Sequence, residues 1–190
     1  MKAFYAERQA LHDPQTFMVA GRFRKAEETP ERATRLREGA LAAGLSFAEP
    51  KHAGTAAISA VHTPQYLEFL RTIHDRWSKI PGAAPEVIPN QHLDRALGGY
   101  PQSPTGLACY HQADAACPIG PGTWEASVWS AQTAIAAADA VLEGARAAYA
   151  LSRPPGHHAY DDLAGGFCFL NNSAIAAGML RQRYPRVAIL

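Results

Sequence analysis

The chain has 190 residues, of which 47% are apolar and 18% are charged, and its formal net charge is +1. This length allows one domain with a hydrophobic core, and the near-neutral charge argues against the clustered Lys and Arg of a nucleic-acid-binding surface. No stretch approaches the roughly 20 apolar residues of a membrane span, and the N-terminus has no apolar run of signal-peptide length. The three cysteines form no Cys-x-x-Cys pair, so we expect a cytoplasmic protein with reduced thiols and neither a nucleic-acid nor a membrane partner.

The first half of the chain alternates short strand patterns with helix starts. The expected elements are a strand at 2–7, a helix that Thr29 caps and Gly44 ends, a strand at 47–52 and a short helix from Thr55 to Val61. Thr63-Pro64 then begins a helix whose apolar positions, such as Tyr66 and Trp77, recur on one face.

The segment 81–121 differs because prolines and glycines interrupt it throughout. Such a stretch forms no long regular element, and loops of this length in compact domains are usually functional or disordered. Its aromatic residues and Ile119 favour an ordered loop. We therefore expect one domain over 1–190 that contains a long Pro/Gly-rich loop at about 80–123.

The last part of the chain again alternates helices and strands. The expected elements are an Ala-rich helix at 123–148 that Thr123 caps, a buried strand at 149–152, a helix from Asn171 or Asn172 to about Arg183, and a central strand at 187–190. This order predicts an open α/β sheet with parallel strands, in which ligands bind beyond the carboxyl ends of the strands.

Two adjacent histidines follow one of those strand ends. Arg153-Pro154-Pro155-Gly156 leads directly into His157-His158, and Gly165-Gly166-Phe167-Cys168-Phe169-Leu170-Asn171-Asn172 comes shortly after. A Pro-Pro-Gly turn fixes the backbone at a strand exit, and paired imidazoles can take up one proton and supply another near neutral pH. On their own, two adjacent histidines are more often polar loop residues without a role, and Phe167 and Phe169 alone would be core residues.

These two motifs together resemble the histone deacetylase and acetylpolyamine amidohydrolase superfamily. Thr29-Pro30-Glu31-Arg32 and Val61-His62-Thr63-Pro64-Gln65-Tyr66-Leu67 are also similar to segments of that family, so the resemblance covers nearly the whole chain. It implies an arginase-like α/β fold with a central parallel sheet. It also implies zinc held by two aspartates and a histidine. The first two ligands would directly follow a strand like 187–190, and the third ligand and a catalytic tyrosine would come much later. We therefore expect the metal ligands beyond Leu190, a fold that is incomplete at the C-terminus, and a fragment that is inactive alone.

The resemblance also implies roles for residues within the chain. His158 would be the general base and then the acid that protonates the leaving amine, and His157 would stabilise charge beside it. The carbonyl of Gly166 would accept a hydrogen bond from the substrate amide, and Phe167 would form a wall of the tunnel. Arg32 would line an inner channel or lie on a helix surface.

The Pro-rich segment is similar to the acetylpolyamine amidohydrolase branch, in Gly106, Tyr110, Asp114, Pro118-Ile119 and Gly122-Thr123-Trp124. That branch implies a homodimer through this loop and a narrow entrance that favours a small cationic acetylated substrate. Two alternatives remain, a protein lysine deacetylase of the same superfamily and a catalytically inactive scaffold homologue.

Overall fold

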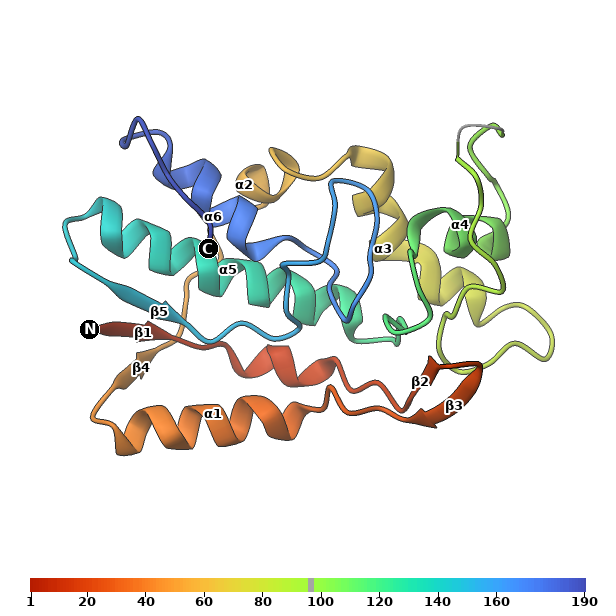
Figure 1. Ribbon diagram of the computed structural model, residues 1–190, viewed down its shortest axis with the longest axis horizontal. Helices are drawn as coiled ribbons and strands as arrows, with labels where there is room; N and C mark the ends of the chain where they lie inside the picture. Colours follow the sequence, from red (N-terminus) through yellow and green to blue (C-terminus); the bar gives the residue numbers. More distant parts are fainter. Residues whose placement is uncertain (96–97) are drawn as a thin grey trace.

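The computed structural model describes residues 1–95 and 98–190 (Figure 1). Its elements in chain order are β1 (Lys2–Phe4), the 3-10 helix η1 (Glu7–Leu11), β2 (Thr16–Val19), β3 (Arg22–Lys25), α1 (Pro30–Ala42), β4 (Ser46–Ala48), α2 (Ala56–Ser59), α3 (Pro64–Trp77), α4 (Pro104–His111), α5 (Thr123–Leu142), β5 (Ala148–Ala150) and α6 (Asn172–Leu180). The predicted loop at 80–123 includes two positions, 96 and 97, that lie outside the described residues.

A three-stranded parallel sheet confirms the predicted α/β arrangement. Its order is β4-β1-β5, and Ala3 at its centre is in register with Phe47 and Tyr149. Helix α5 packs on β1 and β5 and also contacts α6. In Figure 1, α5 therefore runs through the middle of the molecule, between this sheet and α6.

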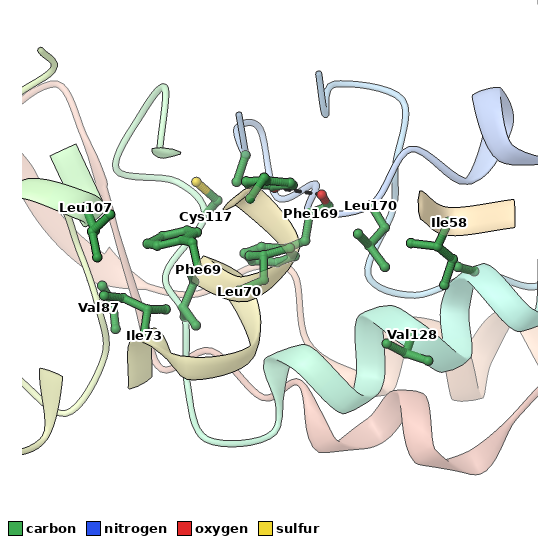
Figure 2. Close-up of a cluster of buried hydrophobic side chains, with 14 of the residues drawn as sticks. Ile58, Phe69, Leu70, Ile73, Val87, Leu107, Cys117, Val128, Phe169 and Leu170 are labelled. Atoms are coloured by element: carbon green, nitrogen blue, oxygen red, sulfur yellow. Dashed lines mark hydrogen bonds between the residues drawn. The ribbon is translucent and has the colours of Figure 1, made fainter. Parts of the chain in front are cut away.

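The main hydrophobic core lies where α3 and α5 meet the loops on either side of them (Figure 2). The predicted apolar face of α3 is buried: Tyr66 and Ile73 are fully enclosed. Thr63 accepts a hydrogen bond from the backbone N–H of Tyr66, as expected of a helix cap. Phe169 and Leu170, which follow the glycine pair, belong to the same core, so the loop that carries the second motif is anchored in the interior.

Several predicted boundaries were wrong. Residues 16–25 form an antiparallel hairpin that the sequence analysis missed, and α4 is a regular helix inside the proline-rich segment. Ser103 caps α4 and Pro104 begins it, so this proline starts a helix rather than preventing one. Thr123 is the first residue of α5 rather than its cap, which is Gly122.

The predicted central strand at 187–190 is also wrong for this structure. Residues 186–190 have no regular secondary structure, and the side chains of Ile189 and Leu190 are exposed. A strand needs neighbours to pair its backbone N–H and C=O groups, and no described strand lies in register with this run. Strand β5 is likewise at the edge of its sheet, with β1 as its one partner among the described residues.

Among the residues that the structure describes, no helix combines the length and the apolar character that crossing a membrane requires.

Candidate active site

Side chains of α5 and of the start of α6 hold the turn before the histidine pair in place. The hydroxyl of Ser130 donates a hydrogen bond to the carbonyl of Pro154 at 2.7 Å, and the side chain of Asn172 donates to Ser130 at 2.8 Å. Gly156 is required at its position because a Cβ atom there would overlap the carbonyl oxygen of Leu170 and lie 2.5 Å from the backbone nitrogen of Asn172. The turn therefore has little freedom to move.

His157 and His158 leave this turn side by side. Their ring centroids are 4.3 Å apart with an angle of 60° between the ring planes, and both residues are exposed. Both residues line a hollow of about 420 Å³. The residues that line it are Val61, His157, His158, Ala159, Tyr160, Asp161, Asn171 and Ala174. The two imidazoles are thus adjacent and accessible, as proton transfer to a small substrate requires.

The glycine–phenylalanine turn lies directly against the second imidazole. A Cβ atom on Gly166 would come within 2.7 Å of Cδ2 of His158, so the glycine backbone packs on the ring itself. The half-buried side chain of Phe167 makes an edge contact with Phe17 of the β2–β3 hairpin, at 6.0 Å between centroids. The structure thus places the backbone of Gly166, with Phe167 next to it in sequence, against the ring of His158.

Phe169 behaves differently from Phe167, as the sequence analysis allowed. Its side chain is fully buried, and its carbonyl accepts a hydrogen bond of 2.7 Å from the hydroxyl of Tyr66. Phe167 has a positive φ of 68°, which turns the chain between the two phenylalanines. The Phe169 ring therefore belongs to the core, while the half-buried Phe167 ring contacts Phe17.

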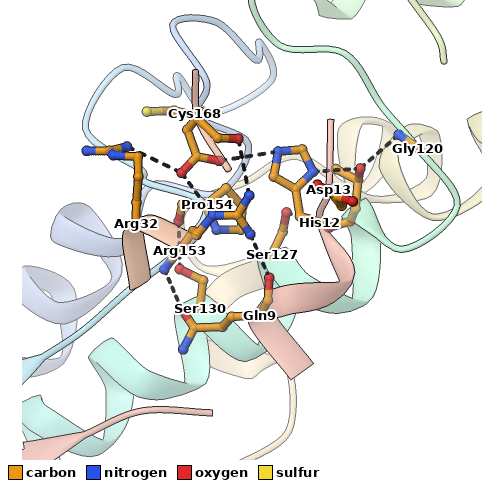
Figure 3. A network of polar contacts seen from close by, with 12 residues as sticks. Gln9, His12, Asp13, Arg32, Gly120, Ser127, Ser130, Arg153, Pro154 and Cys168 are labelled. Atoms are coloured by element: carbon orange, nitrogen blue, oxygen red, sulfur yellow. Dashed lines mark hydrogen bonds and ion pairs between the residues drawn. The ribbon is translucent and has the colours of Figure 1, made fainter. Parts of the chain in front are cut away.

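A buried ionic network supports the first residue of the motif (Figure 3). The guanidinium of Arg153 donates to a carboxylate oxygen of Glu28 at 3.0 Å and to the carbonyl of Gln9 at 3.1 Å. Only 4% of the Arg153 side chain and 1% of the Glu28 side chain are exposed. Burial raises the pKa of Glu28, against the opposing effect of Arg153, and burial lowers the pKa of Arg153.

His12 completes this network as a neutral residue. Burial, with Arg153 nearby, lowers the pKa of its imidazole to about 3. Its Nδ1 lies 2.9 Å from the hydroxyl of Thr123, and its Nε2 is 3.8 Å from the carboxylate of Glu28. Glu28 thus balances the charge of Arg153, and the neutral His12 adds no second positive charge to the network.

Arg32 lies at the edge of the same network. Its guanidinium is 3.3 Å from Glu28, and 57% of its side chain is exposed. The structure therefore places it on the surface of α1 with its head group turned to a buried carboxylate.

His62 fastens the two ends of the loop that follows the histidine pair. Its Nδ1 donates to the carbonyl of Asp161 at 3.1 Å, while its Nε2 accepts from the backbone N–H of Asn171 at 2.9 Å. This arrangement requires the neutral imidazole, and burial lowers the pKa of His62 accordingly. His62 is therefore a structural histidine, in contrast to the exposed pair.

The aspartates beside the pair do not form a metal centre. Asp162 is ion-paired with Arg95, and Asp161 is exposed. Within residues 1–95 and 98–190, no group of three or more His, Cys, Asp or Glu side chains could hold a metal ion. The described residues thus show an exposed histidine pair with the Gly166 backbone against one ring, while the roles of these residues and the location of the zinc ligands stay predictions.

Sequence reasoning missed the partners that arrive from distant segments. Glu28 is 125 positions from Arg153, and nothing in the local pattern around either residue signals the pair. His62 was noticed only as part of a motif, and no periodicity indicated that its ring would bond to the loop at 161–171.

Comparison with known proteins gives consistent matches. The family model described as "Histone deacetylase domain" matches residues 25–190. An acetylpolyamine amidohydrolase of Burkholderia pseudomallei (strain 1710b) is 48% identical over 193 residues, which cover 100% of this chain and 55% of that protein. Acetylpolyamine amidohydrolase 1 of Pseudomonas aeruginosa is 37% identical over 195 residues, which cover 100% of this chain and 56% of that protein.

The fold matches a solved structure as well. The crystal structure of acetylpolyamine aminohydrolase from Burkholderia pseudomallei superimposes with a TM-score of 0.91 at 47% identity, covering 96% of this chain and 53% of that chain. The chain therefore shares that fold over nearly all its residues, and it spans about half the length of the curated relatives it matches.

Proposed function

Because the chain belongs to the histone deacetylase domain family, we propose that the complete protein is an amidohydrolase that removes acetyl groups from acetylated polyamines. The observation that carries the proposal is the accessible pair of imidazoles, 4.3 Å apart, with the Gly166 backbone packed on one of them. The relatives that match the whole chain at 48% and 37% identity bear the name acetylpolyamine amidohydrolase, which supports this substrate class.

In this proposal His158 performs the proton transfers. It accepts the proton of the attacking water and then delivers it to the nitrogen of the departing amine, so that the amide becomes acetate and a free amine. His157 stabilises charge beside it. The carbonyl of Gly166 accepts a hydrogen bond from the substrate amide N–H, and Phe167 forms a wall of the tunnel. In the structure this carbonyl also accepts a hydrogen bond of 3.4 Å from the thiol of Cys168.

Zinc is part of the proposal for the complete protein only. Its ligands are proposed to follow Leu190, since the described residues offer no metal-binding group. Bound there, zinc would polarise the acetyl carbonyl as a Lewis acid.

Replacement of His158 tests the central role. In the complete protein, His158→Ala is expected to lower turnover of N-acetylputrescine by about 10²-fold or more, as loss of a general acid–base group does, while zinc content measured by atomic absorption stays unchanged. His52→Ala, which removes another exposed histidine, is the control. Loss of zinc together with activity would show that His158 is a ligand instead.

A comparison of substrates separates the two enzymatic alternatives. The complete protein is expected to hydrolyse N-acetylputrescine with a higher kcat/KM than acetyl-lysine peptides. Faster peptide turnover would favour the protein lysine deacetylase. Absence of turnover on both substrates with zinc bound would favour the inactive scaffold.

We also propose a homodimer formed through residues 80–123 and a cytoplasmic location. In support, α4 of this segment lies at the end of the molecule away from the three-stranded sheet (Figure 1), and Tyr100 before it is exposed. The three cysteines are free and buried, which fits a reducing compartment. Sedimentation of the complete protein as a monomer at micromolar concentration would contradict the dimer.

A further inference from the structure

The long proline-rich segment runs beside the glycine turn and is hydrogen-bonded to it. The carbonyl of His111 accepts from the N–H of Ala164 at 2.8 Å, and the carbonyl of Ala164 accepts from the N–H of Ala113 at 2.7 Å. The next contact is made by a side chain: the carboxylate of Asp114 accepts from the N–H of Gly166 at 2.8 Å. The segment thus follows the turn up to the residue that packs on the imidazole.

Asp114 is itself held in place. Its second carboxylate oxygen accepts a hydrogen bond from the N–H of Ala116 at 2.9 Å, which closes a turn of the kind that aspartates favour. Both oxygens are therefore occupied by backbone donors, and hydrogen bonds from N–H to an ionised carboxylate are among the stronger ones. The backbone donors therefore hold the carboxylate of Asp114 in one position.

The turn at 165–168 has an unusual backbone conformation that its surroundings must stabilise. Gly166 and Phe167 have φ values of 54° and 68°, both in the left-handed region. A phenylalanine is rarely found there and stays only when its surroundings enforce the conformation. The reciprocal bonds between Gly165 and Cys168, at 3.1 and 2.9 Å, close the turn from within, and Asp114 fixes it from outside.

We propose that Asp114 is a positioning residue for the His158–Gly166 contact. Because no side chain intervenes between Gly166 and the ring, a shift of this backbone moves both the imidazole and the carbonyl that faces the substrate. Asp114 thereby sets the distance between the proton-transfer group and the amide acceptor. This inference rests on the proposed deacetylase activity and assigns to it a residue of the proline-rich segment.

Kinetics of Asp114→Ala in the complete protein test this role. A misplaced catalytic group can cost up to about 10²-fold in rate, so kcat is expected to fall about tenfold or more, with KM within about twofold of the wild type. The fall should be equal for N-acetylputrescine and for uncharged N-acetylbutylamine. Asp114→Asn keeps one acceptor oxygen for Gly166 and is expected to recover part of the lost kcat.

Ser103→Ala is the matched control. It removes a side-chain acceptor for a backbone N–H of the same segment, that of Gly106 at 3.1 Å, at the start of α4. It is expected to leave kcat unchanged. Side-chain NMR signals of ¹⁵N-labelled histidines add a readout that loss of stability alone does not move: the His158 resonance should shift in Asp114→Ala and stay in place in Ser103→Ala.

The outcomes are distinct. An unchanged kcat or an unmoved His158 resonance in Asp114→Ala would overturn the positioning role. A rise of KM for N-acetylputrescine alone would show instead that Asp114 binds the substrate's ammonium group. An inactive wild type would reject the proposed function, while the NMR comparison would still decide whether Asp114 positions His158.

Discussion

The turn at 153–158 was predicted to follow a strand and the run at 187–190 was predicted to form one, and the two segments differ in how the structure holds them. The turn is held by Ser130 and by the buried Arg153–Glu28 pair. The apolar run has no regular structure, and 60% of Ile189 is exposed. Apolar composition alone therefore does not order a segment. Order requires partners for its backbone groups and a surface that encloses its side chains.

The largest expected effect comes from removing a residue that supports the turn at 153–158. Glu28→Ala would leave the Arg153 guanidinium buried without its carboxylate, and removal of one partner of a buried pair costs about 3–5 kcal/mol of unfolding free energy. Glu31→Ala, which removes the exposed i,i+4 pair with Arg35, should leave the thermal midpoint nearly unchanged. Thermal denaturation of both variants measures the difference, and equal midpoints would show that the buried network does not stabilise the turn.

The next effect tests the tight packing of the turn. Gly156→Ala is expected to lower the unfolding free energy by about 1–3 kcal/mol, because the added methyl group meets backbone atoms of Leu170 and Asn172 that cannot move aside. Gly178→Ala on α6 meets nothing within 4 Å and should stabilise by up to about 1 kcal/mol. Urea titration checks the opposite signs; a neutral Gly156→Ala would show that the turn can relax.

The pH dependence of stability tests whether the buried network around Arg153 keeps His12 neutral. The folded-state pKa of His12 is about 3, below its ordinary value of 6.5, so the unfolded chain takes up a proton first as the pH falls. His12 therefore makes stability decrease from pH 6.5 toward pH 3, by up to about 1.4 kcal/mol per pH unit, with full stability above pH 6.5. His12→Asn should flatten this slope between pH 5 and 6.5. Parallel curves for the variant and the wild type would contradict a neutral buried His12.

The smallest effect belongs to the apolar run. In the 190-residue chain, Ile189→Ser is expected to change the unfolding free energy by less than about 0.5 kcal/mol, as exposed substitutions usually do. In the complete protein the same change should cost several times more if the run becomes a central strand there. Equal, small effects in both proteins would reject the expectation of a strand at 187–190.

Local sequence signals predicted the elements whose causes are local. Thr63-Pro64 located the start of α3 because a cap and a first-turn proline act on adjacent residues. The two-part motif and its resemblance predicted the deacetylase fold, which the solved structure at a TM-score of 0.91 confirms. The β2–β3 hairpin was missed because its strands are short, β3 is fully exposed and Phe17 is the one buried residue of β2, so no alternating apolar pattern marks them.

The sequence by itself determined the Pro-Pro-Gly turn, the adjacent histidines and the family to which they belong, since these depend on covalent order and backbone stereochemistry. Only the tertiary structure decided which distant groups hold them: Glu28 against Arg153, His62 across the following loop and Asp114 beneath Gly166. Such contacts join residues far apart along the chain. Their partners are chosen by the packing that buries each polar group, and a local pattern carries no record of that choice.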